Sequence, residues 1–228
     1  MKYLLMVGDG MADFPLPDQG NRTPLQIADT PNMDFLADRG EIGMVKTVPE
    51  KFKPGSDVAN LSLLGYDPQR YYTGRAAFEA LGMELKPEEA EVFYRCNLVK
   101  LDSAEDFETA IMEDFSGGHI TTAASRLLID ALNRAVRGES KWSRFRFSTG
   151  VSYRHLLRWK EGDDQAQCTP PHDIIGQPVA PYLPQAGSAA PLLVELQSLA
   201  AKVMHDDYPE AAANAIWLWG QGKKPEMD

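Results

Sequence analysis

The chain has 228 residues, of which 43% are hydrophobic and 25% charged, so it is typical of a globular protein with one large domain or two small ones. Its 33 acidic and 23 basic residues give a net charge of −10, which argues against a general nucleic-acid-binding protein. No apolar run approaches the ~20 residues that cross a bilayer, and the first ten residues are too short for a signal peptide. We therefore expect a cytoplasmic protein without a membrane partner, and two free cysteines, Cys96 and Cys168.

The N-terminal segment has the pattern of an open α/β sheet. Residues 2–7 are an apolar run that predicts a strand buried on both faces, and Asp9 follows at its end. Thr23 is a suitable N-cap for a helix over residues 24–39, which an internal proline must interrupt or restart. Residues 41–48 predict a second strand. The expected fold class is α/β, although two strands are fewer than a doubly wound sheet needs.

The rest of the chain predicts short helices and then a mixture of strands and helices. Residues 161–187 should be irregular because they are rich in proline and glutamine. The expected elements are helices over 57–64, 75–81, 121–136 and 191–204, and strands over 92–101, 144–147, 151–159 and 214–220. The helix over 121–136 should bury one apolar face, which contains Ala124, Leu127, Leu128, Leu132 and Val136.

Asp9 and Ser56 are the first candidates for chemistry. Asp9 lies between two glycines at a predicted strand end, where a carboxylate can hold a divalent metal or simply complete a turn. Ser56 follows Gly55 and opens a helix, so free N–H groups would stabilise a phosphate there, although an ordinary N-cap serine is commoner. A serine needs a base or a metal to attack, and one ion bridging Asp9 and Ser56 would serve.

A basic stretch over residues 134–160 stands out in this acidic chain. Alternation along its second strand puts Arg154 and His155 on opposite faces, so both cannot point into one pocket. The arginines of this stretch could clamp a phosphate or a carboxylate, or they could form a solvated sheet face. His119 follows two glycines on a loop that we expect to be flexible, where it could meet an anion. The spacing of the histidines and cysteines predicts no zinc site.

Nine long motifs are spread over essentially the whole chain. They are GDGMAD at 8–13, TPLQIADTPNMDFLADRG at 23–40, PGSDVANLSLLGYDP at 54–68, YYTGRAAFEALG at 71–82, FYRCNLV at 93–99, FSGGHI at 115–120, GVSYRHLLRW at 150–159, PPHDIIGQP at 170–178 and ANAIWLWGQGKKP at 213–225. In these motifs the chain resembles the cofactor-independent phosphoglycerate mutases of the archaeal type, which are alkaline-phosphatase-like metalloenzymes.

The resemblance implies a glycolytic isomerase that interconverts 3-phosphoglycerate and 2-phosphoglycerate through a phosphoserine intermediate, without a bisphosphoglycerate cofactor. By position, Ser56 would be the catalytic nucleophile, and Asp9 and Ser56 would bind a divalent metal, which we expect to be manganese, with magnesium and zinc as alternatives. The residues implied to bind the small phosphorylated substrate are Arg75, His119, Arg154, Lys223 and Lys224.

The same resemblance implies a domain layout. Residues 1–82 would be the N-terminal part of the doubly wound, alkaline-phosphatase-like domain, residues 83–222 an inserted α+β domain that covers the substrate, and residues 223–228 a return linker. Family members continue further and carry more aspartate and histidine metal ligands. We therefore expect an N-terminal fragment that is inactive alone and that self-associates through open sheet edges.

Two other functions remain open from the sequence. Bacterial members of this branch have been labelled proposed homoserine kinases, so the enzyme could be a phosphatase or phosphotransferase acting on another small phosphorylated metabolite. The chain could also be a non-catalytic module that binds a phosphorylated ligand. Product analysis with 3-phosphoglycerate separates the first alternative from a mutase, and calorimetry with and without manganese separates the second.

Overall fold

The computed structural model describes residues 1–103 and 107–227. The chain divides into two compact units, Met1–Lys46 and Thr47–Asp228. None of the helices in the described residues is long and apolar enough to span a bilayer.

The Met1–Lys46 unit consists of short helices and loops. Its elements are η1 (Pro17–Gln19), α1 (Pro24–Ile27) and α2 (Pro31–Arg39). Thr23 caps α1 as predicted, because its Oγ1 accepts from the Gln26 N–H at 3.2 Å while Gln26 Oε1 accepts from the Thr23 N–H at 2.9 Å. The expected interruption of the helix is also confirmed, since a proline begins α2.

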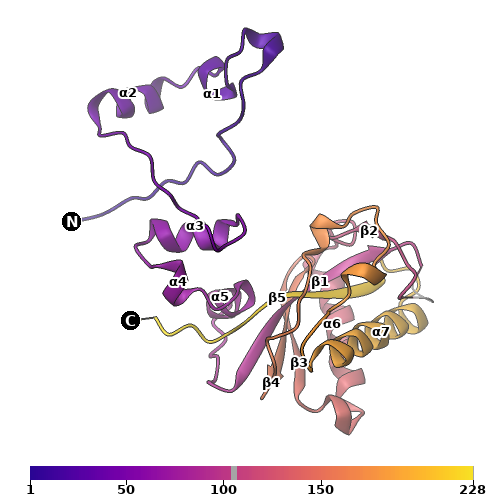
Figure 1. Cartoon of the computed structure of the whole chain (residues 1–228). Coiled ribbons are helices and arrows are strands. Elements are labelled where there is room, and N and C mark those ends of the chain that lie inside the picture. Colours follow the sequence, from indigo (N-terminus) through magenta and orange to yellow (C-terminus); the bar gives the residue numbers. More distant parts are fainter. Residues whose placement is uncertain (104–106, 228) are drawn as a thin grey trace. The chain divides into compact units, whose positions relative to one another are not determined.

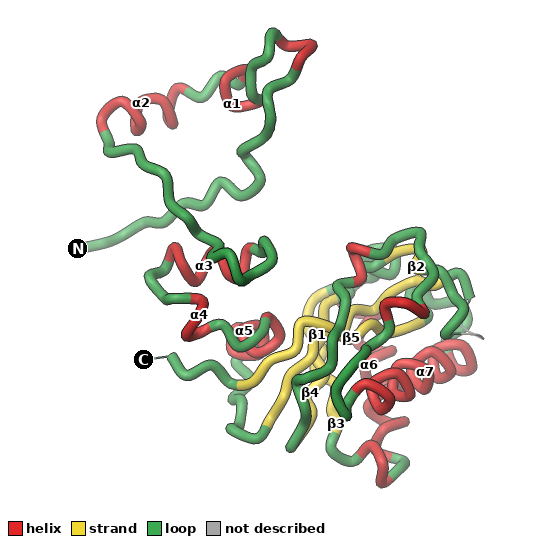
Figure 2. Tube along the Cα trace, in the orientation of Figure 1, coloured by secondary structure: helices red, strands yellow, loops and turns green. Residues whose placement is uncertain are grey.

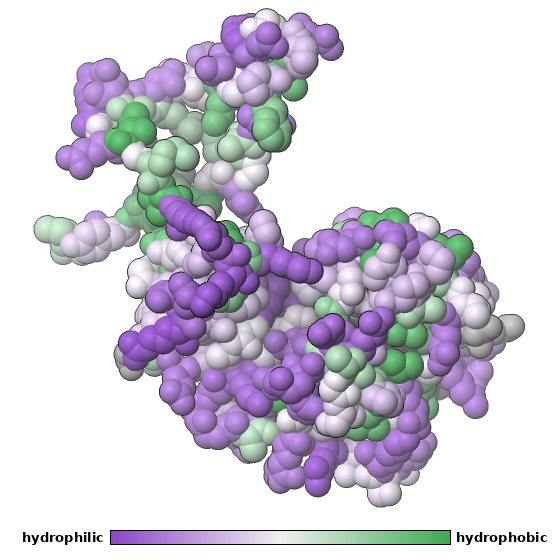
Figure 3. All heavy atoms as spheres, in the orientation of Figure 1, coloured by the Kyte–Doolittle hydropathy of each residue, from purple (hydrophilic) through white to green (hydrophobic). Residues whose placement is uncertain are grey.

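The strands predicted over residues 2–7 and 41–48 are wrong for the described structure, which has loops there. Most of their apolar side chains are exposed, as Leu4 (85%) and Met44 (101%) illustrate, and apolar groups are visible as green spheres on this unit (Figure 3). An apolar run predicts burial, but a strand also needs neighbouring strands for its N–H and C=O groups. The described sheet has only antiparallel strand pairs, so it is not the doubly wound parallel sheet expected from the sequence.

The Thr47–Asp228 unit is a mixed α/β structure built around a five-stranded antiparallel sheet (Figures 1 and 2). Its helices are α3 (Ser56–Leu63), α4 (Pro68–Tyr71), α5 (Arg75–Gly82), α6 (Thr122–Arg137) and α7 (Ala190–Asp207), with single turns η2 (Ser140–Trp142), η3 (Pro171–Asp173) and η4 (Ala180–Tyr182). Its strands are β1 (Glu91–Leu101), β2 (Met112–Asp114), β3 (Phe145–Val151), β4 (Arg154–Lys160) and β5 (Ala215–Lys223).

The central strand β1 organises the sheet. The strand order is β2-β1-β4-β3, and β5 pairs with β1 as well. In this register Arg95 lies between Leu156 of β4 and Trp219 of β5. Because neighbouring residues of a strand point to opposite faces, the two faces of β1 have different compositions.

One face of the sheet is covered by α6 and α7 (Figure 1). The side chains of Tyr94, Cys96 and Leu98 belong to the core on this face. On the other face, Ala76 and Ala80 of α5 pack on Phe93 and Leu156. The apolar face predicted for α6 is correct at Leu128, Leu132 and Val136, which are buried, and wrong at Ala124 and Leu127, which are exposed.

The β3–β4 hairpin turns later than predicted. The sequence predicted a loop at residues 148–150, whereas β3 continues to Val151 and the chain reverses at Ser152, which has a φ of 54°. Gly150 is instead a point of close approach, since a Cβ there would lie 2.2 Å from the Arg154 carbonyl oxygen.

Candidate functional site

Ser56 is the first residue of α3, with Gly55 as the N-cap. The first hydrogen bond of the helix runs from the Ala59 N–H to the Gly55 carbonyl at 3.0 Å, so the N–H groups of Ser56, Asp57 and Val58 have no partner within the helix. The Ser56 residue is exposed. A phosphate on its hydroxyl would meet the positive end of the helix dipole, as the sequence predicts.

Asp57 ties this helix start to the segment before α5. Tyr72 Oη donates a hydrogen bond to Asp57 Oδ2 at 2.5 Å, and the Tyr72 ring lies 5.7 Å from the Phe52 ring and 6.0 Å from the Phe78 ring, measured between centroids. Burial and the bond to Asp57 raise the pKa of Tyr72, so its hydroxyl stays protonated and remains a donor. The position of Ser56 is therefore fixed through its neighbour in sequence.

Arg75 and Arg95 form a cationic group beside the Asp57–Tyr72 hydrogen bond. Arg75 Nε donates to Glu79 Oε1 at 3.1 Å, and Arg95 Nε donates to Glu79 Oε2 at 2.8 Å. The two guanidinium carbons lie 5.7 Å and 4.2 Å from the centre of the Trp219 ring. Both charges act to lower the pKa of Tyr72, whose hydroxyl is bonded to Asp57 at the start of α3. Because two arginines share one carboxylate, they keep positive charge and N–H donors with which to bind an anion.

Arg154 and His119 meet at Tyr153. The Arg154 guanidinium carbon lies 4.6 Å from the centre of the Tyr153 ring, and the His119 ring lies 6.1 Å from it between centroids. Burial, opposed by Glu79, holds the pKa of Arg95 below its ordinary value, and the charge of Arg154 lowers it further. Arg75 and Arg154 therefore both act on Arg95, and His119 is linked to Arg154 through the Tyr153 ring.

The opposite orientations predicted for Arg154 and His155 are confirmed. Arg154 is exposed, whereas His155 is buried with an exposed fraction of 1%. Of these two residues, only Arg154 is accessible to a ligand.

Asp114 holds the loop that carries His119. Its carboxylate accepts from the Ser116 N–H and Oγ, each at 2.6 Å, and from the Gly118 N–H at 3.0 Å, while the His119 N–H donates to Ser116 Oγ at 3.1 Å. Burial acts to raise the pKa of Asp114, but these hydrogen bonds outweigh it and hold the pKa below its ordinary value. The loop expected to be flexible is therefore fastened at several atoms.

The two predicted lysines pair with acids. Lys223 Nζ lies 3.1 Å from Asp164 Oδ1, and Lys224 Nζ lies 2.6 Å from Glu89 Oε1. These contacts hold them at the end of β5, and their role in substrate binding stays a prediction. Asp9 belongs to the Met1–Lys46 unit, so its convergence with Ser56 also stays a prediction.

Across residues 1–103 and 107–227, no group of three or more His, Cys, Asp or Glu side chains is arranged to hold a metal ion. The donors predicted for a metal, the Asp9 carboxylate and the Ser56 hydroxyl, are hard oxygens of the kind that Mn²⁺ and Mg²⁺ prefer. Cys96 and Cys168 are both free thiols, as predicted, and burial raises the pKa of each.

A family model described as 2,3-bisphosphoglycerate-independent phosphoglycerate mutase matches residues 37–208. The chain belongs to this family. It is 46% identical to a Geobacter sulfurreducens protein named probable 2,3-bisphosphoglycerate-independent phosphoglycerate mutase, and 44% identical to a Methanothrix thermoacetophila protein of the same name without "probable". Both matches cover 100% of this chain but only 57% and 56% of the relatives, so the chain spans about half their length.

Two solved structures are similar to this member of the mutase family. A protein from Pyrococcus horikoshii matches with a TM-score of 0.63 and 25% identity over 96% of this chain and 50% of its own. The cofactor-independent phosphoglycerate mutase from Thermoplasma acidophilum matches with a TM-score of 0.54 and 25% identity over 96% of this chain and 59% of its own.

Three residues of the site in this mutase-family chain were not predicted from the sequence. Arg95 has only 5% of its side chain exposed and is central to the cationic group, Trp219 donates from Nε1 to Asn97 Oδ1 at 3.0 Å, and the His172 ring lies 5.4 Å from the Trp219 ring. A signal was present, because the arginine and asparagine in FYRCNLV interrupt a strand that is otherwise apolar. Buried charged residues need a partner and so mark a site worth inspecting.

Proposed function

We propose that this chain supplies the nucleophile and the anion-binding face of a phosphoglycerate mutase, an isomerase that interconverts 3-phosphoglycerate and 2-phosphoglycerate without a bisphosphoglycerate cofactor. The observation that supports this most strongly is the link from Ser56 to the arginines. Asp57, the neighbour of Ser56, accepts from Tyr72, and Tyr72 lies within the electrostatic reach of Arg75 and Arg95. A phosphate acceptor and cations for a phosphorylated carboxylate are thus combined in one unit.

The chemistry proceeds in two transfers. In the first, Ser56 Oγ loses its proton and bonds to phosphorus, while the bond from phosphorus to the C3 oxygen of 3-phosphoglycerate breaks and that oxygen takes a proton. The glycerate stays bound and reorients. Its C2 hydroxyl then loses its proton and bonds to phosphorus as the Ser56 ester breaks and Ser56 Oγ takes a proton, which gives 2-phosphoglycerate and restores the Ser56 hydroxyl. The free N–H groups of α3 stabilise the phosphoryl group, and the arginines hold the remaining anionic groups.

Asp9 and Ser56 would hold a divalent cation in this scheme, with manganese as the first choice and magnesium or zinc as alternatives. When bound, such an ion lowers the pKa of a coordinated hydroxyl and offsets phosphate charge. We further infer that residues 1–82 are part of an alkaline-phosphatase-like domain, that residues 83–222 form the inserted domain, and that residues 223–228 return to the first. The family resemblance and the half-length match to the relatives support this layout.

Phosphorus NMR with 3-phosphoglycerate and Mn²⁺ tests the proposal. The chain alone should show no turnover, whereas the chain extended by the remaining part of the Geobacter sulfurreducens relative should form 2-phosphoglycerate. In the extended protein, Ser56→Ala should abolish the reaction, and Ser62→Ala on the same helix should not. Release of inorganic phosphate would indicate a phosphatase instead, and unchanged turnover in Ser56→Ala would refute the proposed nucleophile.

A further inference from the structure

A second cationic site lies at the free edge of the sheet. A cavity of about 640 Å³ opens between α6, β3 and the segment after α5, with Arg158 of β4 in its wall. Four arginines line it, and a single carboxylate, Asp130, opposes them. It shares no lining residue with the group formed by Arg75, Arg95 and Arg154. Arg158 and Arg154 are four residues apart on β4, which corresponds to roughly 13 Å along the strand.

Two of the four guanidinium groups are already engaged. Arg158 contacts the buried Glu91 as well as Glu88, and Arg134 Nη2 donates to the Tyr208 hydroxyl at 3.2 Å. In the residues that the structure describes, the side chains of Arg137 and Arg146 have no hydrogen bond or ion pair, and both residues are exposed. Two free donors of the type that binds phosphate and carboxylate therefore face the same cavity.

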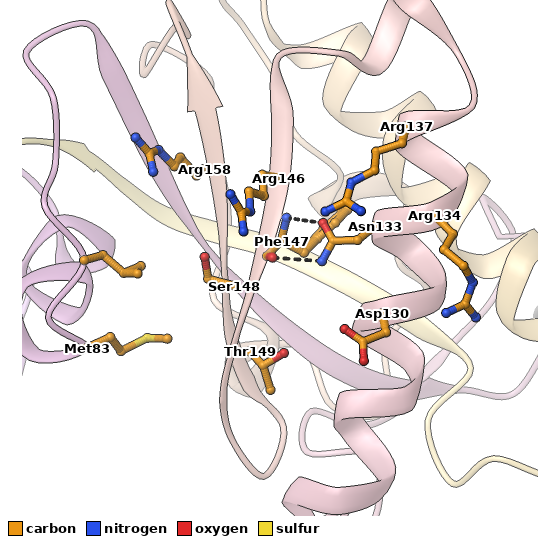
Figure 4. Close-up of a pocket in the computed structure, with 11 residues that line it drawn as sticks. Met83, Asp130, Asn133, Arg134, Arg137, Arg146, Phe147, Ser148, Thr149 and Arg158 are labelled. Atoms are coloured by element: carbon orange, nitrogen blue, oxygen red, sulfur yellow. Dashed lines mark hydrogen bonds between the residues drawn. The ribbon is translucent and has the colours of Figure 1, made fainter.

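Two hydrogen bonds join the elements of the cavity wall. Asn133 of α6 holds the edge of β3, because its Nδ2 donates to the Phe147 carbonyl at 2.9 Å while its Oδ1 accepts from the Phe147 N–H at 3.0 Å. Figure 4 shows the guanidinium groups of Arg146 and Arg137 on the two sides of this Asn133–Phe147 pair. The backbone that carries these arginines therefore needs little rearrangement when a ligand binds, and the binding cost lies mainly in the rotamer freedom that the free side chains lose.

Like charges lie next to one another in this wall, and Arg158 has acidic partners in Glu88 and Glu91. Arg146 and Arg158 are direct cross-strand partners, an arrangement in which like charges repel. Arg134 and Arg137 are three residues apart on α6, which also brings like charges together. An anion between them would relieve this repulsion. Ser148 and Thr149 add hydroxyl donors to the same wall.

We propose that this cavity binds a small polyanion that carries phosphate or carboxylate groups. Its volume lies within the ~300–1,000 Å³ of small-molecule sites, and its wall is mostly cationic and hydroxylated rather than apolar. The inference does not depend on the proposed mutase reaction, because none of its residues is assigned to the transfer of the phosphoryl group.

Calorimetry of the 228-residue chain at low ionic strength tests the site, with pyrophosphate and citrate as probes. The double variant Arg137→Gln/Arg146→Gln should weaken binding by roughly a hundredfold, since each of the two lost charge-assisted contacts accounts for about tenfold, or about 1.4 kcal/mol. The matched control Arg126→Gln/Lys202→Gln removes the same charge from α6 and α7 outside the cavity and should stay within about twofold of the wild type. Citrate separates a polycarboxylate site from a phosphate site.

Two further variants make the result decisive. Arg137→Lys/Arg146→Lys keeps the charge but loses the bidentate geometry, so its affinity should fall between those of the wild type and the Gln variant. Arg154→Gln should leave this binding unchanged. Absence of binding by both probes, wild-type affinity in the Arg137→Gln/Arg146→Gln protein with its circular dichroism intact, or loss of binding in Arg154→Gln would each overturn the proposal.

Discussion

His155 gives the chain a specific dependence of stability on pH. The side chain is buried on β4, and its Nδ1 accepts from the Gly150 N–H at 3.0 Å. The proton of the neutral ring therefore lies on Nε2, which has no hydrogen-bond partner among the described residues. Burial lowers the pKa of His155 to about 4. Protonation would add a proton to Nδ1 and place a positive charge in the core, so the folded state disfavours the protonated ring.

The magnitude follows from linkage. The folded pKa of about 4 lies below the value of roughly 6.5 expected in the unfolded chain, so the contribution of His155 is complete above about pH 6.5 and is lost as the pH falls towards 4. The free energy of unfolding should therefore decrease by roughly 2 kcal/mol between about pH 7 and pH 5. Asp114, whose pKa is also lowered, acts in a more acidic range and does not obscure this window.

Urea unfolding followed by tryptophan fluorescence across this pH range provides the assay. His155→Gln keeps an acceptor for the Gly150 N–H but cannot titrate, so the decrease in unfolding free energy should disappear. His205→Gln, at an exposed position near the end of α7, should retain it. The reasoning is refuted if the wild type shows no decrease between about pH 7 and pH 5, or if His155→Gln shows the same decrease.

Three further changes have predictable effects on unfolding. Arg95→Met should cost roughly 2–3 kcal/mol in urea unfolding, because it removes a buried cation from its carboxylate; a loss below about 0.5 kcal/mol would contradict this. Gly74→Ala should cost about 3 kcal/mol or more, because Gly74 has a φ of 120° and a Cβ there would lie 1.8 Å from a backbone oxygen. In the control Gly82→Ala, the added Cβ meets nothing within 4 Å, so this variant should be neutral or stabilising in a thermal melt. Asp114→Asn should cost roughly 1–2 kcal/mol near neutral pH and less at low pH, where the wild-type carboxyl is protonated; equal losses at both pH values would argue against the role of its charge.

The sequence predicted the elements of the Thr47–Asp228 unit better than those of the Met1–Lys46 unit, and the reason is physical. The residues of β1, β4 and β5 find antiparallel partners within this unit, so their apolar pattern and their pairing agree. Residues 2–7 have an equally apolar pattern but no strand beside them in the described structure. Local patterning therefore predicts which residues favour a strand, and pairing decides whether the strand forms.

Only part of the site was predicted from the sequence, and the reason is related. Residues with a local signal, such as Ser56 after a glycine and Arg154 on an alternating strand, were found. Arg95 and Trp219 act through contacts between β1, β5 and α5, and such contacts depend on register, which the sequence alone does not supply. The turn at Ser152 was missed because Gly150, the usual marker of a turn, is needed for close packing instead.

The convergence of Asp9 and Ser56 on one ion is tested most directly by Mn²⁺ binding measured with electron paramagnetic resonance. Asp9→Asn and Ser56→Ala should each weaken Mn²⁺ binding by roughly tenfold, since each removes one oxygen ligand. The matched controls Asp13→Asn and Ser62→Ala should leave the affinity within about twofold of the wild type. Mn²⁺ binding that is equally tight in Asp9→Asn, Ser56→Ala and the wild type would contradict a shared ion.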